Sequence, residues 1–323
     1  MAGGRPVLVT GARGYLGGRI CRAIAARADL ELIGASRQAQ PPLGWSAGRF
    51  LCLAPTADMT AFLEDLKGVD TIVHLAGSDQ AGARSDPAGT LAGTVGNLVR
   101  LLKAAIALGI RRFVYVSTAH VYGTPPIGTI DEHSLPRPQN PYAIIHRTAE
   151  DFILAARDAG QIEGVVLRLS NGIGAPAWRD NAQCSTLGND LCCQAATGDV
   201  LKLSSSGEQW RDFITLGDIA AAMLHILDLP ADRLGDGLFN LGGEMPLRVI
   251  DVAELVAQRA AFLFGRNLVI NRPQGPAAER LDYRIDKIRA TGFQLRGDLT
   301  GEIDATLRLC VESFLQSTAP NQG

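Results

Sequence analysis

The sequence has no excess of charge of one sign and no long hydrophobic run. Its 323 residues include 31 lysines and arginines and 33 aspartates and glutamates, for a net charge of −2. A nearly balanced chain has no electrostatic reason to bind nucleic acid or an anionic membrane surface. No apolar run reaches the length of a membrane span, and the first strand-like segment begins almost at once, so we expect no signal peptide. These absences predict a cytoplasmic protein without a nucleic acid or membrane partner.

The sequence also lacks the cysteine spacings of metal sites. Its six cysteines, at positions 21, 52, 184, 192, 193 and 310, include no CxxC pair and have no ligand partners at metal-binding spacing. Two of them are adjacent, which is a poor arrangement for a mutual disulfide. We therefore expect no metal site and six reduced thiols, as in a cytosolic protein.

What is present is typical of a globular protein. Hydrophobic residues make up 46% of the chain and charged residues 20%, in a length that suffices for one large or two closely packed domains. Strand-like and helix-like segments alternate through the first half, which predicts an α/β fold with a doubly wound parallel sheet of the Rossmann type. The expected strands are 7–9, 30–35, 71–75, 112–117 and 165–169, and the expected helices are 58–67, 94–108 and 141–159.

After Ser170 the chain becomes richer in loops. We expect Asp218 to be the N-cap of a helix at 218–229. Other expected helices are 190–197, 249–264 and segments near Lys287 and Glu302, and other expected strands are 201–203, 213–216, 238–241 and 268–270. Strands 213–216 and 238–241 should return to the main sheet. The predicted domains are a cofactor-binding one from residues 1–170 and 211–243, and a smaller C-terminal α/β substrate-binding one from residues 171–210 and 244–323.

The stretch VLVTGARGYLG, residues 7–17, combines a strand, a turn and the start of a helix. Three glycines follow the strand at a spacing of three. The first permits a tight turn, the second lets the backbone approach a pyrophosphate, and the third lets the helix pack closely on the strand. Since the start of a helix favours anions, we expect a dinucleotide here rather than an ordinary glycine-rich turn. The expected cofactor-binding residues of this stretch are Gly11, Arg13, Gly14, Tyr15, Leu16 and Gly17.

The second expected strand ends in Ser36 and Arg37, without the acidic residue that would bind the ribose 2′-hydroxyl of NAD. Arg37, together with Arg13 of the glycine turn, suits a 2′-phosphate, because a guanidinium binds phosphate through two hydrogen bonds. We therefore expect NADP(H) as the preferred cofactor. NAD(H) is the alternative, if both arginines are merely solvated and Ser36 meets a plain ribose.

Three residues with catalytic chemistry follow the strand at 112–117. Thr118 closes it, Tyr142 begins the long helix, and His146 lies one turn later on the same helical face. A tyrosine can exchange a proton with a ligand oxygen while nicotinamide exchanges a hydride, a hydroxyl can hold the carbonyl, and a nearby cation lowers the pKa of the tyrosine. Thr118, Tyr142 and His146 are thus the expected catalytic residues, and the last two are also expected to contact the cofactor.

Six segments carry a resemblance to a known family: VTGARGYLG, GVDTIVHLAG, FVYVSTAHVYG, PYAIIH, LRLSNGIGAP and QWRDFITLGDIA. The chain resembles the extended short-chain dehydrogenases/reductases, which include nucleotide-sugar epimerases, dehydratases and reductases, over nearly its whole length. The resemblance implies that Thr118 orients the substrate carbonyl and that Tyr142 is the acid/base. It also implies cofactor contacts from Leu75, Ala76 and Gly77, and contacts with a nucleotide-diphosphate sugar from Thr118, His120, Asn171 and Arg211.

The chain departs from this family at three positions. His146 stands where the family has a lysine, Thr94 where many relatives have an asparagine, and Leu53 where relatives often have an aspartate. Lysine is a permanent cation near neutral pH, whereas a histidine, with an ordinary pKa of about 6.5, can be neutral. These departures leave open a catalytically weak relative that keeps cofactor binding.

The residues after Thr118 argue against a dehydratase, because dehydratases of this family carry Asp-Glu where this chain has Ala119 and His120. If the two arginines bind a 2′-phosphate, we expect an NADPH-dependent reductase of a 4-keto-6-deoxy nucleotide sugar, with hydride going to C4 and Tyr142 protonating the oxygen. The alternative is an NAD-dependent nucleotide-sugar 4-epimerase. Most relatives dimerise through two helices, so the resemblance also implies a homodimer through helices 94–108 and 141–159.

Overall fold

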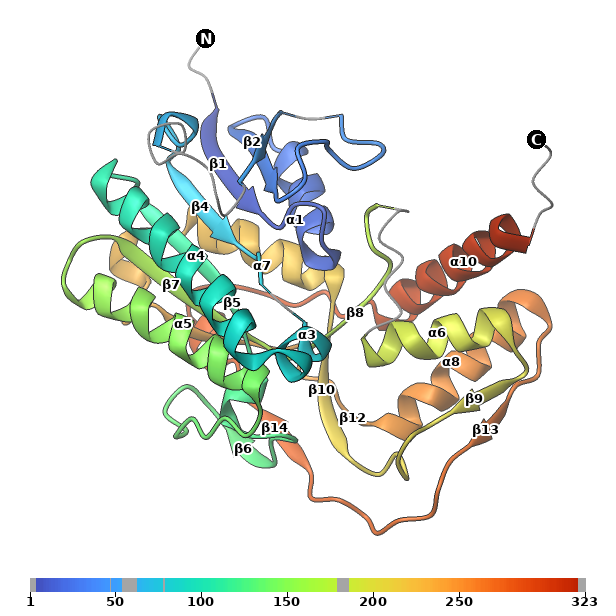
Figure 1. Cartoon of the computed structure of the whole chain (residues 1–323). Helices are drawn as coiled ribbons and strands as arrows, with labels where there is room; N and C mark the ends of the chain where they lie inside the picture. The colour runs from blue at the N-terminus through green and yellow to red at the C-terminus, as the bar shows by residue number, and fades with distance from the viewer. Residues whose placement is uncertain (1–3, 47, 54–62, 78, 179–185, 319–323) are drawn as a thin grey trace.

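The computed structural model describes residues 4–318 apart from 47, 54–62, 78 and 179–185. Its centre is a seven-stranded parallel sheet in the order β11-β7-β5-β4-β1-β2-β3 (Figure 1). The strands are β1 Arg5–Thr10, β2 Leu30–Ser36, β3 Arg49–Cys52, β4 Thr71–His74, β5 Arg112–Thr118, β7 Glu163–Leu169 and β11 Leu238–Leu241. This architecture confirms the predicted α/β fold with a Rossmann-type parallel sheet.

Helices cover both faces of the sheet, as the apolar strands of a parallel sheet require. On one face, α1 (Tyr15–Ala25) packs against α7 (Leu216–Asp228), in a core that includes Val7 and Val9 of β1. On the other face, α4 (Pro87–Ala107) lies beside α5 (Pro141–Asp158), in a core that includes Leu8. Successive residues of β1 therefore serve opposite faces.

Smaller sheets and a second group of helices accompany the main sheet (Figure 1). The helices α6, α8 and α10 share a separate core with residues such as Leu191, Val252 and Ile303. Their bounds are α6 Leu187–Thr197, α8 Val249–Phe264 and α10 Leu299–Thr318. The sheets pair β8 Asn171–Ile173, β10 Trp210–Thr215 and β12 Pro246–Arg248; β9 Val200–Lys202 and β13 Val269–Asn271; and β6 Gly128–Ile130 and β14 Leu281–Tyr283. The remaining short helices are α3 Gln80–Ser85, α9 Asp286–Ala290, η1 Ala119–Tyr122 and η3 Ala231–Arg233.

Several predicted details are wrong. The strand expected at 213–216 is β10, which pairs with β8 and β12 and does not return to the main sheet, whereas β11 does. Thr215, not Asp218, caps α7, because its side chain accepts the N–H of Asp218. α4 begins at Pro87 rather than at 94, since Asp86 caps it by accepting the N–H of Gly89. Of the helix expected at 58–67, residues 58–62 lie outside the described residues.

The expectation of six reduced cysteines is also wrong. Cys193 is disulfide-bonded, while Cys21, Cys52, Cys192 and Cys310 are free and Cys184 lies outside the described residues. Neighbouring helical residues point about 100° apart, so Cys192 is buried in the core while Cys193 is half-buried. The Sγ of Cys193 also contacts the free thiol of Cys310, at 3.3 Å. Spacing along the chain does not reveal which sulfurs the fold brings together.

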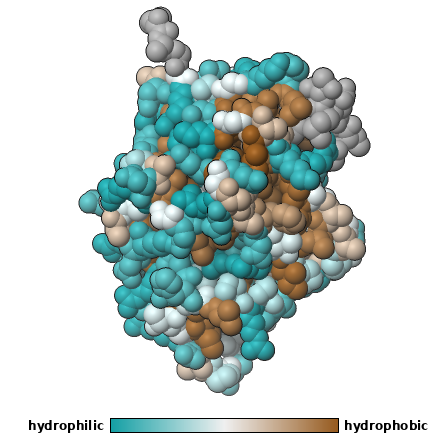
Figure 2. Space-filling view, turned by 90° about the vertical axis from the view of Figure 1, so that its left-hand side faces the viewer, coloured by the Kyte–Doolittle hydropathy of each residue, from teal (hydrophilic) through white to brown (hydrophobic). Residues whose placement is uncertain are grey.

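Within the described residues, no helix is long and apolar enough to cross a membrane. The same residues hold no group of three or more His, Cys, Asp or Glu side chains that could bind a metal ion. Figure 2 shows one face of the molecule as a mosaic, in which hydrophilic residues surround smaller groups of hydrophobic ones. The division into two domains at the boundaries given above stays a prediction.

Candidate active site and cofactor cleft

The glycine turn between β1 and α1 is as tight as its sequence predicts. Gly11 has a φ of 72°, in the left-handed region that favours glycine. A Cβ on Gly17 would lie 2.1 Å from the carbonyl oxygen of Gly11, so any side chain there would push α1 away from the turn. Gly14 is the N-cap of α1 and leaves the first N–H groups of the helix available to an anion.

A cleft of about 1100 Å³ opens beside this turn. Its walls are the glycine turn, the ends of β2 and β4 and one face of α4. Eight of the residues expected to bind the cofactor line this cleft. They are Gly11, Arg13, Gly14, Ser36, Arg37, Leu75, Ala76 and Gly77. The volume and the glycine-lined wall fit an extended dinucleotide, with the arginines at the end formed by β2.

Tyr15, Leu16 and Gly17 are not part of the cleft wall. The Tyr15 hydroxyl donates to the carbonyl oxygen of Gly174 at 3.0 Å, and burial raises its pKa far above the ordinary value. Leu16 packs against the core between the sheet and α7. The side chains of Tyr15 and Leu16 thus hold the turn in place. Toward a phosphate, residues 15–17 offer only their backbone N–H groups.

Arg100 is a cleft residue that the sequence reasoning missed. It lines the cleft from α4, together with Thr90, Thr94 and Asn97. The signal was available, because spacings of three and four place these residues on one face of a helix. Three arginines, Arg13, Arg37 and Arg100, thus belong to the wall of one cleft.

Thr118 and Tyr142 come together although they lie on different elements. Thr118 ends β5 and is the N-cap of η1. Its Oγ1 accepts a hydrogen bond from the N–H of His120 at 3.2 Å. Tyr142 is in the first turn of α5, where Asn140 caps the helix and Pro141 precedes the tyrosine. Burial raises the pKa of Tyr142, and a hydrogen bond with the Thr118 side chain opposes that rise. The two hydroxyls therefore form one polar pair.

His146 lies next to this pair, one helical turn after Tyr142. The two rings meet edge to face, with 4.4 Å between their centroids. The Nδ1 atom of His146 is 2.7 Å from the Tyr115 hydroxyl of β5. Burial, followed by the nearby His120 and His74, lowers the pKa of His146 to about 4. At neutral pH the imidazole is therefore neutral, unlike the lysine of the resemblance.

The expected substrate residues His120, Arg211 and Asn171 contact or face one another, and His120 lies beside Tyr142. The His120 ring lies 6.3 Å from the ring of Tyr142, and burial, followed by the charge of Arg211, lowers the pKa of His120 to about 4. Arg211 donates to Oδ1 of Asn171 at 3.3 Å across the paired strands β10 and β8. Among the described residues, Nδ1 of His120 and Nε of Arg211 are buried without a hydrogen-bond partner. Buried polar atoms of this kind point to a ligand.

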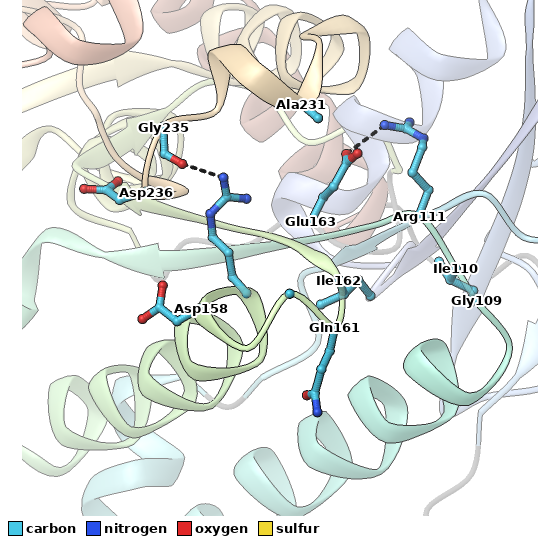
Figure 3. Close-up of a pocket in the computed structure, with 12 residues that line it drawn as sticks. Gly109, Ile110, Arg111, Asp158, Gln161, Ile162, Glu163, Ala231, Gly235 and Asp236 are labelled. Atoms are coloured by element: carbon cyan, nitrogen blue, oxygen red, sulfur yellow. Dashed lines mark hydrogen bonds and ion pairs between the residues drawn. The ribbon is translucent and has the colours of Figure 1, made fainter.

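A second cavity, of about 520 Å³, lies at the opposite edge of the sheet and has no such atoms. Figure 3 shows that Arg111 points to Glu163, with which it forms a 2.9 Å ion pair, and that the Gly235 carbonyl accepts a hydrogen bond. The donor to Gly235 is Arg157, which also donates to Gly164. Among the described residues that line this cavity, none has a buried side-chain polar atom without a hydrogen-bond partner, so the cleft remains the better candidate site.

Known proteins match the chain over most of its length. Residues 7–242 match the NAD dependent epimerase/dehydratase family. The chain is 30% identical over 323 residues to a dTDP-6-deoxy-L-talose 4-dehydrogenase (NAD(P)(+)) of Kitasatospora kifunensis, covering 97% of this chain and 96% of that protein. It is 30% identical over 303 residues to a UDP-glucose 4-epimerase of Azospirillum brasilense, covering 88% of this chain and 85% of that protein.

Solved structures share the fold. The UDP-N-acetylglucosamine 4-epimerase of Methanobrevibacter ruminantium M1, in complex with UDP-N-acetylmuramic acid, superposes with a TM-score of 0.79. The match covers 98% of this chain and 99% of that chain, at 18% sequence identity. At that identity the superposition supports the architecture and leaves the substrate to the residues of the site.

Proposed function

Since the chain belongs to the NAD-dependent epimerase/dehydratase family of nucleotide-sugar enzymes, we propose that it is an NADPH-dependent reductase of a 4-keto-6-deoxy nucleotide sugar. The observation that carries this proposal is the hydrogen-bonded pair of the Thr118 and Tyr142 hydroxyls, with the rings of His120 and His146 beside Tyr142. The similarity to a dehydrogenase acting on C4 of a 6-deoxy sugar nucleotide agrees with it.

The two hydroxyls divide the work at the substrate. Thr118 holds the C4 carbonyl oxygen by a hydrogen bond, and Tyr142 gives its phenolic proton to that oxygen as the alcohol forms. The nicotinamide, when bound, supplies the hydride to C4. Because burial raises the pKa of Tyr142 and no cation stands at position 146, the phenol keeps its proton at neutral pH. A protonated tyrosine suits reduction, where the site must deliver a proton.

The remaining residues hold the two ends of the reactants. We assign the diphosphate of the sugar nucleotide to Arg211 and Asn171, and the sugar to His120. We assign the 2′-phosphate of NADP(H) to Arg13 and Arg37, which line the end of the cleft next to β2. Guanidinium groups bind phosphate through paired hydrogen bonds, so Arg211 suits the diphosphate, and Arg13 and Arg37 together suit the 2′-phosphate.

A second candidate is an NAD-dependent nucleotide-sugar 4-epimerase. The similarity to the UDP-glucose 4-epimerase, at the same 30% identity, favours it. A third candidate is a catalytically weak protein that binds the cofactor, and the neutral state of His146 favours it.

We further propose a cytoplasmic homodimer formed through α4 and α5. Leu91 of α4, and Ile144 and Phe152 of α5, are large apolar side chains exposed on the surface of this helix pair. Ile144 and Phe152 are eight residues apart, about two helical turns, and so share a face of α5.

Turnover assays separate the three candidates. The purified protein is incubated with NADPH and a dTDP-4-keto-6-deoxyhexose, and separately with UDP-glucose. Oxidation of NADPH with formation of a 6-deoxyhexose supports the reductase. Interconversion of UDP-glucose without net use of cofactor supports the epimerase, and cofactor binding without either reaction supports the weak relative.

Tyr142→Phe should lower turnover about 100-fold or more, while Tyr283→Phe, which removes another buried hydroxyl, should not. Equal turnover by the native protein and Tyr142→Phe would overturn the proposed mechanism.

A further inference from the structure

We propose that Tyr115 is a positioning residue for His146, because its phenol donates to Nδ1 and so fixes the imidazole proton on Nε2. This leaves the Nε2–H group as a neutral hydrogen-bond donor on the ring that packs against Tyr142. The inference rests on the proposed function only where it assigns a benefit for turnover. The position of the proton on the His146 ring does not depend on which substrate the protein binds.

The contact between the two side chains is short and buried. The Tyr115 hydroxyl lies 2.7 Å from Nδ1 of His146, and the two rings stack with 5.7 Å between their centroids. Tyr115 is 2% exposed. Among the described residues, Nδ1 of His146 is the hydrogen-bond partner of that hydroxyl. A buried O–H group needs an acceptor, so Tyr115 donates and Nδ1 accepts.

This direction of donation decides the protonation of His146. In the neutral ring one nitrogen carries the proton and the other accepts, whereas in the cation both nitrogens donate. If Nδ1 accepts from Tyr115, the proton is on Nε2. A cationic ring would turn Nδ1 into a donor and leave the buried Tyr115 O–H group without its acceptor, so this contact disfavours protonation.

The surrounding groups act in the same direction. His74 of β4 and His120 of η1 face the site, and both lower the pKa of His146 beyond the effect of burial. Glu150, one turn later on α5, is paired with Arg168. Burial raises the pKa of Tyr115 well above its ordinary value, so that residue remains a phenol that can donate.

The pair therefore replaces a charge with an oriented dipole. The lysine of the resemblance brings a permanent cation, which lowers the pKa of a neighbouring tyrosine. His146, held by Tyr115, brings a neutral N–H donor at a fixed position and leaves Tyr142 protonated. Since a displaced donor loses much of its effect, the benefit of His146 depends on the Tyr115 hydroxyl.

The test reads the tautomer directly. The protein is labelled with ¹⁵N-histidine, and long-range ¹H–¹⁵N correlation spectra are recorded near neutral pH, with His146→Gln used to assign the signals. We expect one neutral tautomer with the proton on Nε2 in the native protein. In Tyr115→Phe we expect a mixture of tautomers, because Nδ1 has lost its donor. Tyr283→Phe is the matched control and should leave the signals of His146 unchanged. A proton on Nδ1 in the native protein, or the same tautomer in Tyr115→Phe, overturns the proposal.

Kinetics then test the benefit for turnover. Tyr115→Phe should lower kcat on the order of 10- to 100-fold with little change in the KM for the sugar nucleotide. In the His146→Lys background the same change should have little effect, because lysine does not accept from Tyr115. Equal losses in both backgrounds would overturn the positioning role. Absence of any turnover by the native protein would instead refute the proposed function and leave the tautomer result in force.

Discussion

Arg168 and Glu150 form an ion pair that is excluded from solvent, with 2.7 Å between Nη2 and Oε2. Arg168 lies on β7 and Glu150 on α5. The same carboxylate accepts a hydrogen bond from Ser117, the residue before Thr118 on β5. This buried pair thus ties the helix that carries Tyr142 and His146 to the strand that carries Thr118.

We expect Glu150→Ala to destabilise the protein by about 3–5 kcal/mol, because it leaves the buried Arg168 charge without a partner. Urea denaturation followed by circular dichroism measures this. Asp151→Ala is the matched control, since Asp151 is the next residue and is exposed while paired with Arg147. Its loss should cost at most about 1 kcal/mol. Equal costs for the two variants would show that the buried pair contributes nothing special.

The cofactor assignment predicts a selective effect of Arg37. We expect Arg37→Ala to weaken NADPH binding on the order of 10- to 100-fold, because charge-assisted hydrogen bonds to the 2′-phosphate are lost, and to leave NADH binding unchanged. Fluorescence titration with the two nucleotides measures both affinities. Arg49→Ala removes an exposed arginine of β3 that is not part of the cleft wall and serves as control. Tighter binding of NADH by the native protein would refute the 2′-phosphate site.

The dimer proposal predicts the effect of a charge on α5. Phe152→Asp places a carboxylate on an exposed apolar position, and burying it in an interface would cost several kcal/mol. We expect this variant to be monomeric by sedimentation at concentrations where the native protein is dimeric. Phe262→Asp, at an exposed position of α8, is the control and should leave the dimer intact. A native protein that sediments as a monomer contradicts the proposal outright.

The sequence predicted the long, strongly patterned elements and the chemistry that follows them. The strands of the main sheet other than β3, and α5, were found because runs of apolar residues end in glycine, proline or a cap. The strands β8 and β12 were missed, because they lie in loop-rich segments with few apolar residues and distant partners set their pairing. The start of α4 was missed although Asp86-Pro87 is a helix start signal.

The candidate site divides in the same way. Glycine spacing and the residues at strand ends predicted the part of the cleft wall that the glycine turn and the ends of β2 and β4 form, because local sequence sets those positions, but not the part that α4 forms. The contact between Tyr115 and His146 joins residues 31 positions apart and follows from the packing of α5 on β5. No local pattern contains that information. The neutral state of His146 is likewise a consequence of burial, which the sequence alone does not give.

The buried histidines predict how stability depends on pH. Burial lowers the pKa of His74, His120 and His146 to about 4 each. Between about pH 6.5 and pH 4, the unfolded chain takes up protons on these rings and the folded protein does not, so stability falls as the pH falls. Asp212 acts in the opposite direction, because burial raises its pKa to about 6 and the folded protein takes up that proton first.

Burial also lowers the pKa of His225 and raises that of Glu132, so the histidines still outnumber the opposing carboxyl groups and the balance gives acid lability. We expect the free energy of unfolding to decrease by about 1.4 kcal/mol per pH unit for each unbalanced histidine, as the pH falls from 6.5 toward 4. Urea denaturation at several pH values in this window measures the slope. In His74→Gln the slope should be shallower by the share of one histidine, because the replacement does not titrate. A stability that stays constant or rises as the pH falls through this window would mean that the three rings are not neutral in the folded protein.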